Sequence, residues 1–345
     1  MSKWISVAAL VIGLILALSF TALFGENPIR VFQVLLFGAF GSPTDIGYSL
    51  YYATPLLLTG LSVSWAMRVG LFNIGAEGQM ALGGVALAAV GILCANCPWF
   101  VAWPLAFAAA FIMGGVWGAI AGWIKAKRGC HEVLSTILLN FVAYGLSSFL
   151  ILSVFKHPSS QVPETAEVGA GFHIPTLPFG GTSPLNSGLI LSIAMLAIYG
   201  FVMSRTRFGI HQRLVGSAPE TGRRVGVNID RHIILAMFIS GGMAGLAAVS
   251  PVLGFAFKTR EGFTSNAGFV GIAVALLGRN RPLGIFLSAL LFGALTKGSL
   301  DLDLDTQYVP RDLATVIQAL IVLVVACQPG LEELWLRVRR KSNGA

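Results

Sequence analysis

A run of polar side chains interrupts the apolar sequence between residues 68 and 79. It reads Arg68-Val-Gly-Leu-Phe-Asn-Ile-Gly-Ala-Glu-Gly-Gln79, and it sets Asn73, Glu77 and Gln79 among glycines. A carboxylate at membrane depth is costly unless it faces a cavity or a partner group. Irregular backbone is tolerated there only where protein or water satisfies it. The segment is therefore predicted to line a pathway, and the alternative is that Glu77 caps a helix start at the interface.

A second polar stripe lies in His131-Glu-Val-Leu-Ser-Thr-Ile-Leu-Leu-Asn140. Glu132, Thr136 and Asn140 are four residues apart, so they share one face of a helix. That face should point into a helix bundle rather than at lipid. It either lines the translocation path or holds helices together by hydrogen bonds. His131 stands alone beside a basic cluster, and we expect no metal site there.

Two short stretches indicate an internal repeat. Phe72-Asn-Ile-Gly75 follows one apolar window, and Ser265-Asn-Ala-Gly268 follows another five windows later. Many transporters are built from inverted repeats. We therefore predict a 5+5 inverted repeat and add Asn266 to the candidate path. Whether 70–80 and 266–282 are re-entrant stays open.

The basic segment 205–231 contains a helix-start signal. Ser217-Ala-Pro-Glu220 has the spacing of a capping box. In that motif the Ser217 hydroxyl accepts from the amide of Glu220, and the Glu220 carboxylate returns to the amide of Ser217. Pro219 suits the first turn, where its missing N–H costs nothing. The segment therefore predicts the start of a short helix.

The same segment contains a matching helix-stop signal. Arg223 and Arg224 are favourable near the C-terminal end of a helix dipole, and Gly226 can adopt the left-handed conformation that ends a helix. A helix of about eight residues is not stable alone in water. The helix over 217–226 must therefore pack against the underside of this chain or against a partner. The alternative is an ordinary structured loop.

Hydrolytic chemistry has no signature in this sequence. It contains no GxxxxGK[ST] phosphate loop, no H-E-x-x-H and no G-x-S-x-G turn. If ATP drives the protein, another chain must hydrolyse it, and we expect no cofactor here. The four cysteines are expected to be ordinary small side chains, because no second pair or histidine cluster completes a zinc site.

The overall composition indicates a polytopic membrane protein. Of the 345 residues, 55% are hydrophobic and 11% are charged, and the mean hydropathy is +0.79. A soluble domain carries about 25% charged residues because its surface must be wet. This chain has too few charges to cover a water-facing globule of its length, which excludes the soluble function classes.

About ten windows are apolar enough to be membrane-spanning helices, each of which needs about 20 residues. The windows are 4–24, 48–67, 77–94, 99–124, 133–155, 187–204, 232–254, 267–278, 283–298 and 313–327. We expect the first to be a retained helix rather than a cleaved signal peptide. The chain is therefore predicted to be an all-α bundle of about ten transmembrane helices.

The distribution of basic residues predicts the orientation of this bundle. Short loops rich in Lys and Arg stay in the cytoplasm. With the N-terminus inside and one crossing per window, 17 of the 23 basic residues fall inside. We therefore predict cytoplasmic N- and C-termini in a bacterial inner membrane. This asymmetry also explains the net charge of +8, so a nucleic-acid partner is not needed.

A long external segment divides the predicted bundle. Residues 156–186 are rich in proline and glycine, which rules out a long helix and favours a lid, a docking surface or a linker. We divide the single membrane-spanning domain at this segment. The parts are a first half 1–155, the external loop 156–186, a second half 187–335 and a basic tail 336–345.

Three motifs together resemble a known family. Arg213-Leu-Val-Gly216, Pro219 and Arg223-Arg-Val-Gly226-Val-Asn228 resemble the "R-A-V-G-x-N-P-x-x-A-x-x-x-G-I-N" coupling segment of bacterial ABC importer permeases for branched-chain amino acids and simple sugars. This sequence departs from it with Ser217 for Glu, Ala218 for Asn and Gly222 for Ala.

Two further segments narrow the resemblance to the nucleoside-type permeases of that group. They are Gly70–Gln79 and His131–Asn140, the latter similar to "N-E-V-I-S-T-I-M-L-N" with His131 in place of Asn. The resemblance implies an ABC ATPase, a second and different permease, and an extracytoplasmic binding lipoprotein as partners, besides membrane lipid. It also implies alternating access, in which ATP-driven closure of the ATPases pulls on the 217–226 helix.

The resemblance and the local motifs together give two sets of candidate residues. The coupling set is Arg213, Gly216, Ser217, Pro219, Glu220, Arg223, Arg224 and Gly226. The path set is Asn73, Glu77, Gln79, Glu132, Thr136, Asn140 and Asn266.

Other functions remain open from the sequence. Within the same class, the substrate is a nucleoside or, alternatively, a simple sugar or a branched-chain amino acid. From other classes, a proton-coupled secondary transporter can use Glu77 and Glu132, and a structural scaffold or channel needs no energised cycle. Neither of these two classes needs a mechanical docking helix, and that is why the importer is favoured.

Overall fold

The structure is a computed structural model that describes residues 25–305 apart from 158 and 180, and isolated positions in 12–22 and 316–324. Within these residues the chain is helical and forms no strand, only three isolated antiparallel bridges. The all-α class is confirmed. The helices are α2 Pro28–Phe40, α3 Pro43–Arg68, α4 Ala76–Leu93, α5 Trp99–Arg128, α6 Glu132–Phe149, α7 Gly188–Arg205, α8 Arg207–Ser217, α9 Pro219–Arg224, α10 Ile229–Leu246, α11 Val249–Pro251, α12 Ala267–Leu277 and α13 Pro282–Asp305.

Six segments in the described part are long and apolar enough to cross a membrane. They are Ala76–Leu93, Trp99–Arg128, Glu132–Val154, Gly188–Arg205, Ile229–Ala256 and Pro282–Leu302. Each coincides with a predicted window. The window 48–67 falls within the 26-residue α3, and 267–278 is the short α12. The windows 4–24 and 313–327 lie outside the described residues, so the count of ten and the 5+5 repeat stay predictions.

The helix starts follow the local sequence closely. Ser42 accepts a hydrogen bond from the amide of Asp45 ahead of Pro43 at the start of α3. Asn228 does the same for the amide of Arg231 at the start of α10. Both are the short polar side chains that satisfy otherwise unpaired amides in a first turn.

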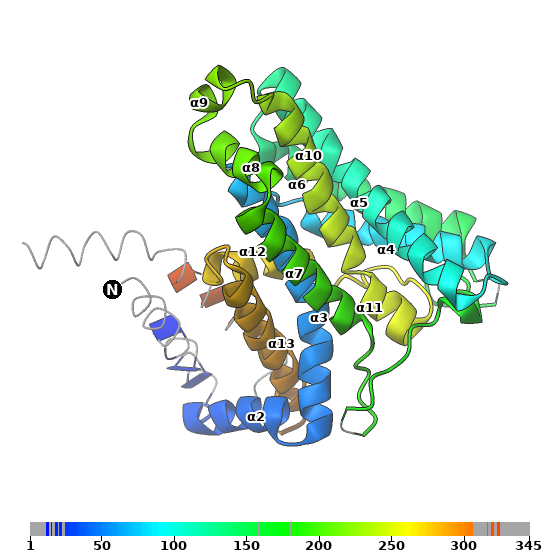
Figure 1. Cartoon of the computed structure of the whole chain (residues 1–345). Helices are drawn as coiled ribbons and strands as arrows, with labels where there is room; N and C mark the ends of the chain where they lie inside the picture. Colours follow the sequence, from blue (N-terminus) through cyan, green and yellow to red (C-terminus); the bar gives the residue numbers. More distant parts are fainter. Residues whose placement is uncertain are drawn as a thin grey trace, which may run out of the picture.

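The helices form a bundle around α3. In Figure 1, α2, α3 and α13 lie on one side, α4, α5, α6 and α10 lie on the other, and α8 and α9 project at the top. From Ala53 to Ala66, α3 is buried at all but one position. This central place explains why α3 carries so many small and hydroxylated residues.

Close packing of α5 on α10 holds one side of the bundle. An ideal Cβ on Gly114 would lie 2.3 Å from the carbonyl oxygen of Gly241, and one on Gly118 would lie 2.3 Å from that of Met237. Side chains larger than hydrogen would therefore separate the two helices. Small residues at such contacts let transmembrane helices approach closely.

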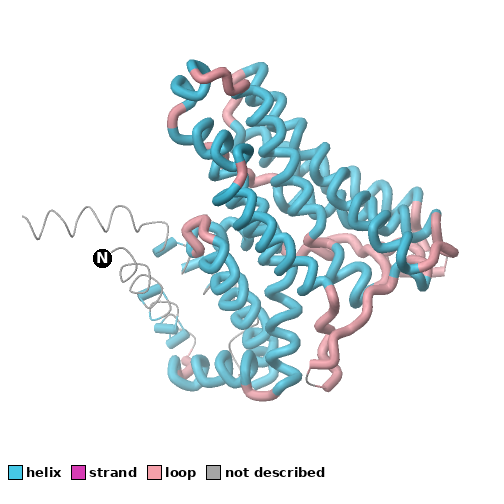
Figure 2. Tube along the Cα trace, viewed as in Figure 1, coloured by secondary structure: helices cyan, strands magenta, loops and turns pink. Residues whose placement is uncertain are grey.

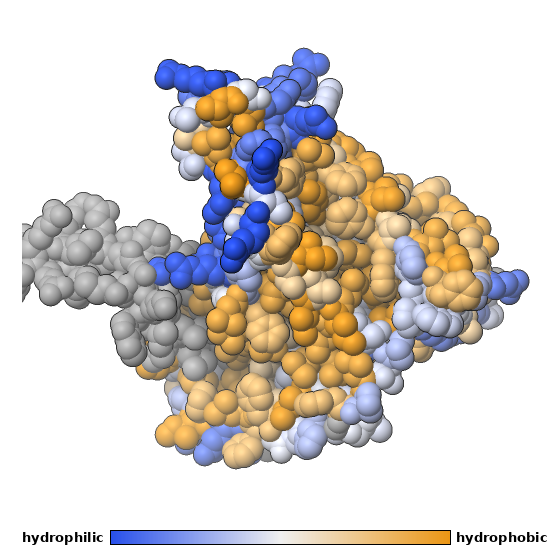
Figure 3. Space-filling view, viewed as in Figure 1, coloured by the Kyte–Doolittle hydropathy of each residue, from blue (hydrophilic) through white to orange (hydrophobic). Residues whose placement is uncertain are grey.

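The basic segments gather at one end of the bundle, here called the α8–α9 end. Lys127 at the end of α5 pairs with Asp230 at the start of α10 at 3.0 Å. Arg68 at the end of α3 donates to the carbonyl oxygen of Asn280 between α12 and α13. Figure 3 shows hydrophilic side chains collected over α8 and α9 and an apolar surface along the bundle.

The segment 155–187 lies at the opposite end and is mostly irregular, as the pink trace of Figure 2 shows. Its regular part is one 3₁₀ turn, Ala170–Phe172. One antiparallel bridge, Glu164 to Arg260, joins it to the segment before α12, and another, Lys156 to Thr165, lies within the loop. The loop is therefore a structured cover over that end, not an extended linker.

Candidate functional site

The first turns of α4 and α12 meet inside the bundle. The Glu77 carboxylate accepts a hydrogen bond from the amide of Gly268 at 2.6 Å, and Glu77 is 1% exposed. Thr264 and the amides of Asn266 and Phe269 also interact with this carboxylate. Negative charge is favourable at a helix N-terminus. Glu77 thus caps α12, rather than the start of its own helix.

The connection between α3 and α4 is held by an amide pair. The Asn73 side-chain nitrogen donates to Gln79 Oε1 at 2.8 Å, and Gln79 Nε2 donates to Asn73 Oδ1 at 3.2 Å. Asn73 also donates to the hydroxyl of Ser240 on α10 at 2.8 Å. Both amides are buried. Their hydrogen bonds are therefore used to hold the irregular backbone of 69–75.

Asn140 secures the same connection from α6. Its Oδ1 accepts from the amide of Gly78 at 3.0 Å, and its nitrogen donates to the carbonyl of Ile74 at 2.9 Å. Thr136 is buried and donates to the carbonyl of Glu132 at 2.8 Å. The structure thus brings Asn73, Glu77, Gln79, Thr136 and Asn140 together as a hydrogen-bonded support.

Glu132 lies away from this centre, at the α8–α9 end. Its carboxylate pairs with Lys125 at the end of α5 at 2.9 Å. The ion pair bridges the turn between α5 and α6. The three polar residues of α6 therefore do not act together. Asn140 lies where α4 meets α12, and Glu132 lies at the α8–α9 end of the bundle.

The length of α12 gives the depth of this meeting point. After α12, the carbonyl of Asn280 accepts from Arg68 and, at 3.1 Å, from the hydroxyl of Tyr199. The 11 residues of α12 rise about 16 Å from that end. The Glu77 and Gly268 contact therefore lies about 16 Å along α12 from the contact between Arg68 and Asn280.

Asn266 differs from the other candidate path residues. It is exposed, as is Ser265, while the other six are buried. Both take left-handed backbone conformations, with φ of 46° at Ser265 and 63° at Asn266. Phe269, one turn into α12, is 38% exposed. Polar side chains within a membrane-spanning bundle usually face a cavity or a partner, so this face is the candidate path surface.

The basic segment forms two helices, not one. The predicted capping box is wrong: Ser217 ends α8, and its hydroxyl donates to the carbonyl of Arg213 at 2.9 Å. Glu220 instead pairs with Arg223 at 2.6 Å. The cap of α9 is Ala218, which provides no side-chain hydrogen bond. A serine within a helix commonly bonds back to the carbonyl four residues earlier.

The predicted helix end is confirmed. Gly226 has a φ of +80°, its amide donates to the carbonyl of Arg223, and the amide of Val227 donates to that of Gly222. These two bonds are the Schellman pattern, which satisfies the last carbonyls of a helix. Pro219 opens α9 as predicted.

All the candidate coupling residues lie on the exposed surface of α8 and α9. Gly216 also touches the body of the bundle, because an ideal Cβ there would lie 2.5 Å from the carbonyl oxygen of Arg68 and 2.9 Å from the amide of Gly70. The exposed residues are Arg213, Gly216, Ser217, Pro219, Glu220, Arg223, Arg224 and Gly226.

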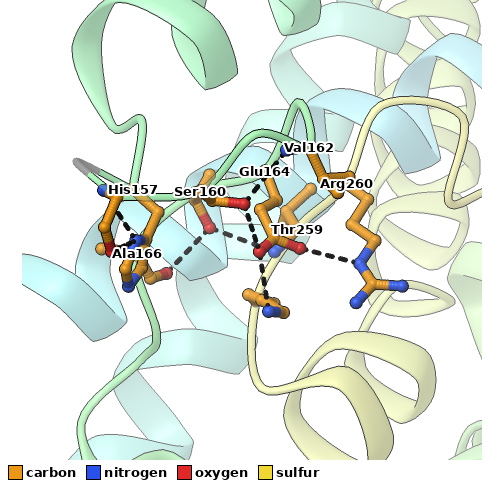
Figure 4. A network of polar contacts seen from close by, with 10 residues as sticks. His157, Ser160, Val162, Glu164, Ala166, Thr259 and Arg260 are labelled. Carbon is orange, nitrogen blue, oxygen red and sulfur yellow. Dashed lines mark hydrogen bonds and ion pairs between the residues drawn. The ribbon is translucent and has the colours of Figure 1, made fainter.

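An ion-pair cluster closes the opposite end. The Glu164 carboxylate pairs with Lys258 at 2.8 Å and with Arg260 at 2.9 Å, and it accepts from the Ser160 hydroxyl at 2.9 Å. Figure 4 shows Ser160 of the loop and Arg260 of the segment before α12 converging on Glu164. The hydrogen bond from Lys258 is the main reason that the pKa of Glu164 falls to about 2.

Sequence reasoning missed two groups at these sites. Arg68 was counted only for orientation, although it precedes the polar run 69–79 directly and binds the turn after α12. Glu164 had no recognisable motif, because its cationic partners lie 94 and 96 residues away. For Arg68, its place directly before a glycine-rich polar run is the sequence signal that could have indicated a structural role.

Comparison with known proteins decides the family. Residues 46–326 match the family described as branched-chain amino acid transport system / permease component. The chain belongs to this family. It is a multi-pass permease subunit of an ABC importer.

Three relatives of the permease cover most of its length. It is 32% identical to the guanosine ABC transporter permease protein NupP of Bacillus subtilis, over 96% of this chain and 95% of that protein. It is 34% identical to the nucleoside ABC transporter permease protein NupB of Lactococcus lactis, over 92% and 89%. It is 32% identical to the glucose ABC transporter permease protein TsgB13 of Haloferax volcanii, over 86% and 80%.

Proposed function

We propose that this permease imports nucleosides by alternating access, driven by a partner ATPase. The observation that supports this most is the exposed polar face at the start of α12, where Ser265 and Asn266 precede the buried contact of Gly268 with Glu77. Two of the relatives named above are nucleoside or guanosine permeases at 32% and 34% identity. Together these favour a small polar solute with an aromatic part.

The exposed face offers groups that suit such a solute. The Asn266 amide can donate to and accept from ribose hydroxyls or base edges. The partly exposed ring of Phe269 can stack on a base, as aromatic side chains do in nucleic-acid binding. In this account Asn266 contacts the solute, while Asn73, Glu77, Gln79, Thr136 and Asn140 support the backbone behind it.

The proposed docking surface for the ATPase is the exposed side of α8 and α9. Arg213, Arg223 and Arg224 give this surface a positive charge, and the Schellman end at Gly226 fixes the position of α9. No phosphate loop lies in this chain, so ATP binds and is hydrolysed in the partner. Glu132, in its ion pair with Lys125, holds α5 and α6 together near this surface.

The remaining partners and the orientation follow from the same account. A second, different permease faces Asn266 and Phe269, so that the path runs between the two chains. The loop 156–186 receives the substrate-binding lipoprotein on the outer side. The α8–α9 end and both termini are cytoplasmic, in a bacterial inner membrane, because the basic segments gather at that end.

A simple sugar is the second candidate substrate. A glucose permease is 32% identical to this chain over 86% of its length, and an exposed asparagine also suits sugar hydroxyls. Phe269 favours the nucleoside, since a sugar without a base makes less use of an exposed ring.

The test is uptake in cells that carry the complete importer or lack this subunit. Tritiated guanosine, uridine, ribose and leucine are supplied in turn, with the partner ATPase intact or with its phosphate-loop lysine replaced. We expect nucleoside uptake that needs both chains. Uptake of ribose or leucine alone would contradict the substrate class. Uptake that ignores the ATPase but follows the proton gradient would contradict the importer mechanism.

A further inference from the structure

Both ends of α12 are held by the connection between α3 and α4. At its start, the amide of Gly268 donates to the Glu77 carboxylate at 2.6 Å. After its end, the carbonyl of Asn280 accepts from the Arg68 guanidinium. Arg68 and Glu77 bracket one ten-residue stretch of the chain. A single connection therefore holds a helix that is about 200 residues distant in the sequence.

The first half of α12 is joined to α3 as well. The Thr59 hydroxyl donates to the carbonyl of Ala267 at 2.9 Å. An ideal Cβ on Gly271 would lie 2.5 Å from Thr59 Oγ1, so the two helices touch at backbone distance. The second half of α3, the connection 68–77 and α12 thus form one packed unit.

The two ends of α12 differ from its middle in backbone conformation. Ser265 and Asn266 precede it with φ of 46° and 63°, and Arg279 and Asn280 follow it with φ of 52° and 56°. The chain therefore turns sharply on both sides of an 11-residue helix. Such paired turns let a short helix move as a unit relative to its neighbours in sequence.

The helix α8 packs on the same unit, where α3 ends and the connection 68–77 begins. Gly216 lies against the carbonyl of Arg68 and the amide of Gly70. Earlier in α8, the Phe208 ring lies 6.4 Å from the Trp65 ring of α3, between centroids. A displacement of α8 therefore presses first on Arg68 and Gly70, the residues that begin the connection.

We propose that Arg68 and Glu77 are positioning residues that make α12 follow α8 during the transport cycle. A shift of α8 moves the connection 68–77. The hydrogen bonds from Gly268 to Glu77 and from Arg68 to Asn280 then transmit that shift to both ends of α12. The exposed face at Asn266 then moves with it. This inference rests on the proposed function for the docking role of α8 and α9, but not on the identity of the substrate.

The experiment measures the position of α12 directly. A variant with the four cysteines replaced by serine receives spin labels at Phe269→Cys on α12 and Val116→Cys on α5. The complex that co-purifies with this chain is placed in nanodiscs, without nucleotide or trapped with ATP and vanadate. We expect the label distance to shift on trapping. In Glu77→Gln the shift should fall by at least half, while Gly145→Ala, at an open position of α6, should leave it unchanged.

Further variants separate positioning from a purely structural role. Arg68→Ala should lower uptake per ATP hydrolysed at least fivefold, and Arg68→Lys, which keeps a cationic donor, should restore part of it. If either loses the complex, Gly216→Ala tests the same route from α8, with Gly145→Ala as the matched control in open space. An unchanged shift in Glu77→Gln and Gly216→Ala would overturn the proposal.

Substrate identity does not enter the spin-label readout. A normal shift that depends on Glu77, without nucleoside uptake, would contradict the proposed substrate and support the role of Arg68 and Glu77. Nucleoside uptake with a shift that is indifferent to these residues would support the proposed function and contradict the inference.

Discussion

Glu77 and Gly268 are 191 residues apart in the sequence, and the carboxylate of one accepts from the amide of the other at 2.6 Å. The contact is buried and joins the first turns of α4 and α12. The backbones are so close that an ideal Cβ on Gly268 would lie 2.3 Å from the amide nitrogen of Glu77. The position therefore tolerates only glycine without movement of α4 or α12.

Gly268→Ala should consequently destabilise the permease. Forcing a methyl group into a packed contact costs about 1–3 kcal/mol, and here the atoms that must move are backbone. We expect a lower midpoint of thermal unfolding and reduced uptake. The matched control is Gly145→Ala, whose added methyl meets no atom within 4 Å. Equal midpoints for the two variants would contradict the close approach of α4 and α12.

Asn140→Ala should act through stability rather than through substrate affinity. It leaves the amide of Gly78 and the carbonyl of Ile74 without their partner. An unsatisfied buried polar group costs about 1–3 kcal/mol. Thermal unfolding of the purified complex should shift downward, while the KM for uptake by the surviving complex stays unchanged. A raised KM with normal unfolding would place Asn140 in the path instead.

Asn266→Gly should give the opposite result. The side chain is exposed and glycine accepts the φ of 63° at this position, so the substitution should leave the unfolding midpoint in place. Loss of one hydrogen bond to the solute, worth about 0.5–1.5 kcal/mol, corresponds to roughly a two- to twelvefold rise in KM for nucleoside uptake. Asn266→Gln provides the control, since it keeps the amide. If Asn266→Gly leaves the KM unaltered, the exposed face of α12 does not contact the solute.

The fold class was readable from the sequence because apolar windows and Pro- or Asn-marked helix starts are local signals. The eight windows within the described residues all fall on helices. The hydrogen-bond partners of the polar residues could not be predicted from the sequence. The sequence groups Asn73, Glu77 and Asn140 as path candidates, since all three interrupt apolar runs. Only their long-range partners show that their polar groups are used within the protein.

The coupling segment shows the same division at a smaller scale. Gly226 and Pro219 act through backbone geometry, which is intrinsic to these residues, and their predicted places are confirmed. Ser217 had two local options, a cap for the following helix or a bond back to its own. The second was realised because α8 extends from Arg207 to Ser217, a length that the spacing S-x-x-E does not encode.

Arg223→Ala should separate docking from folding. The Glu220 and Arg223 side chains are mostly exposed, and such i,i+3 pairs contribute about 0.2–0.5 kcal/mol. Membrane insertion and thermal unfolding should therefore stay near normal, while ATP-driven uptake falls about tenfold or more. Arg30→Ala, at an exposed position of α2, is the matched control. Normal uptake in Arg223→Ala would remove this residue from the docking surface.

The Glu164 cluster should withstand mild acid. Because the pKa of Glu164 in the folded protein is about 2, below its ordinary value of 4.5, the stability it provides is complete above pH 4.5 and is lost as the pH falls toward 2. Amide hydrogen exchange in 156–168, corrected for the intrinsic rate, should show constant protection from pH 5 to 8. Glu164→Gln should lose protection throughout this range. Protection that falls between pH 8 and 5 would contradict the ionised cluster.

The central claim is that this chain is the membrane path of an ATP-driven nucleoside importer. It is tested most directly by tritiated guanosine uptake into proteoliposomes that contain the purified complex, its binding lipoprotein and internal ATP. The account predicts accumulation that stops when this permease is omitted and when the phosphate-loop lysine of the ATPase is replaced. Accumulation of guanosine without a functional ATPase would contradict it. ATP hydrolysis that no nucleoside stimulates and that is not accompanied by nucleoside uptake would contradict it as well.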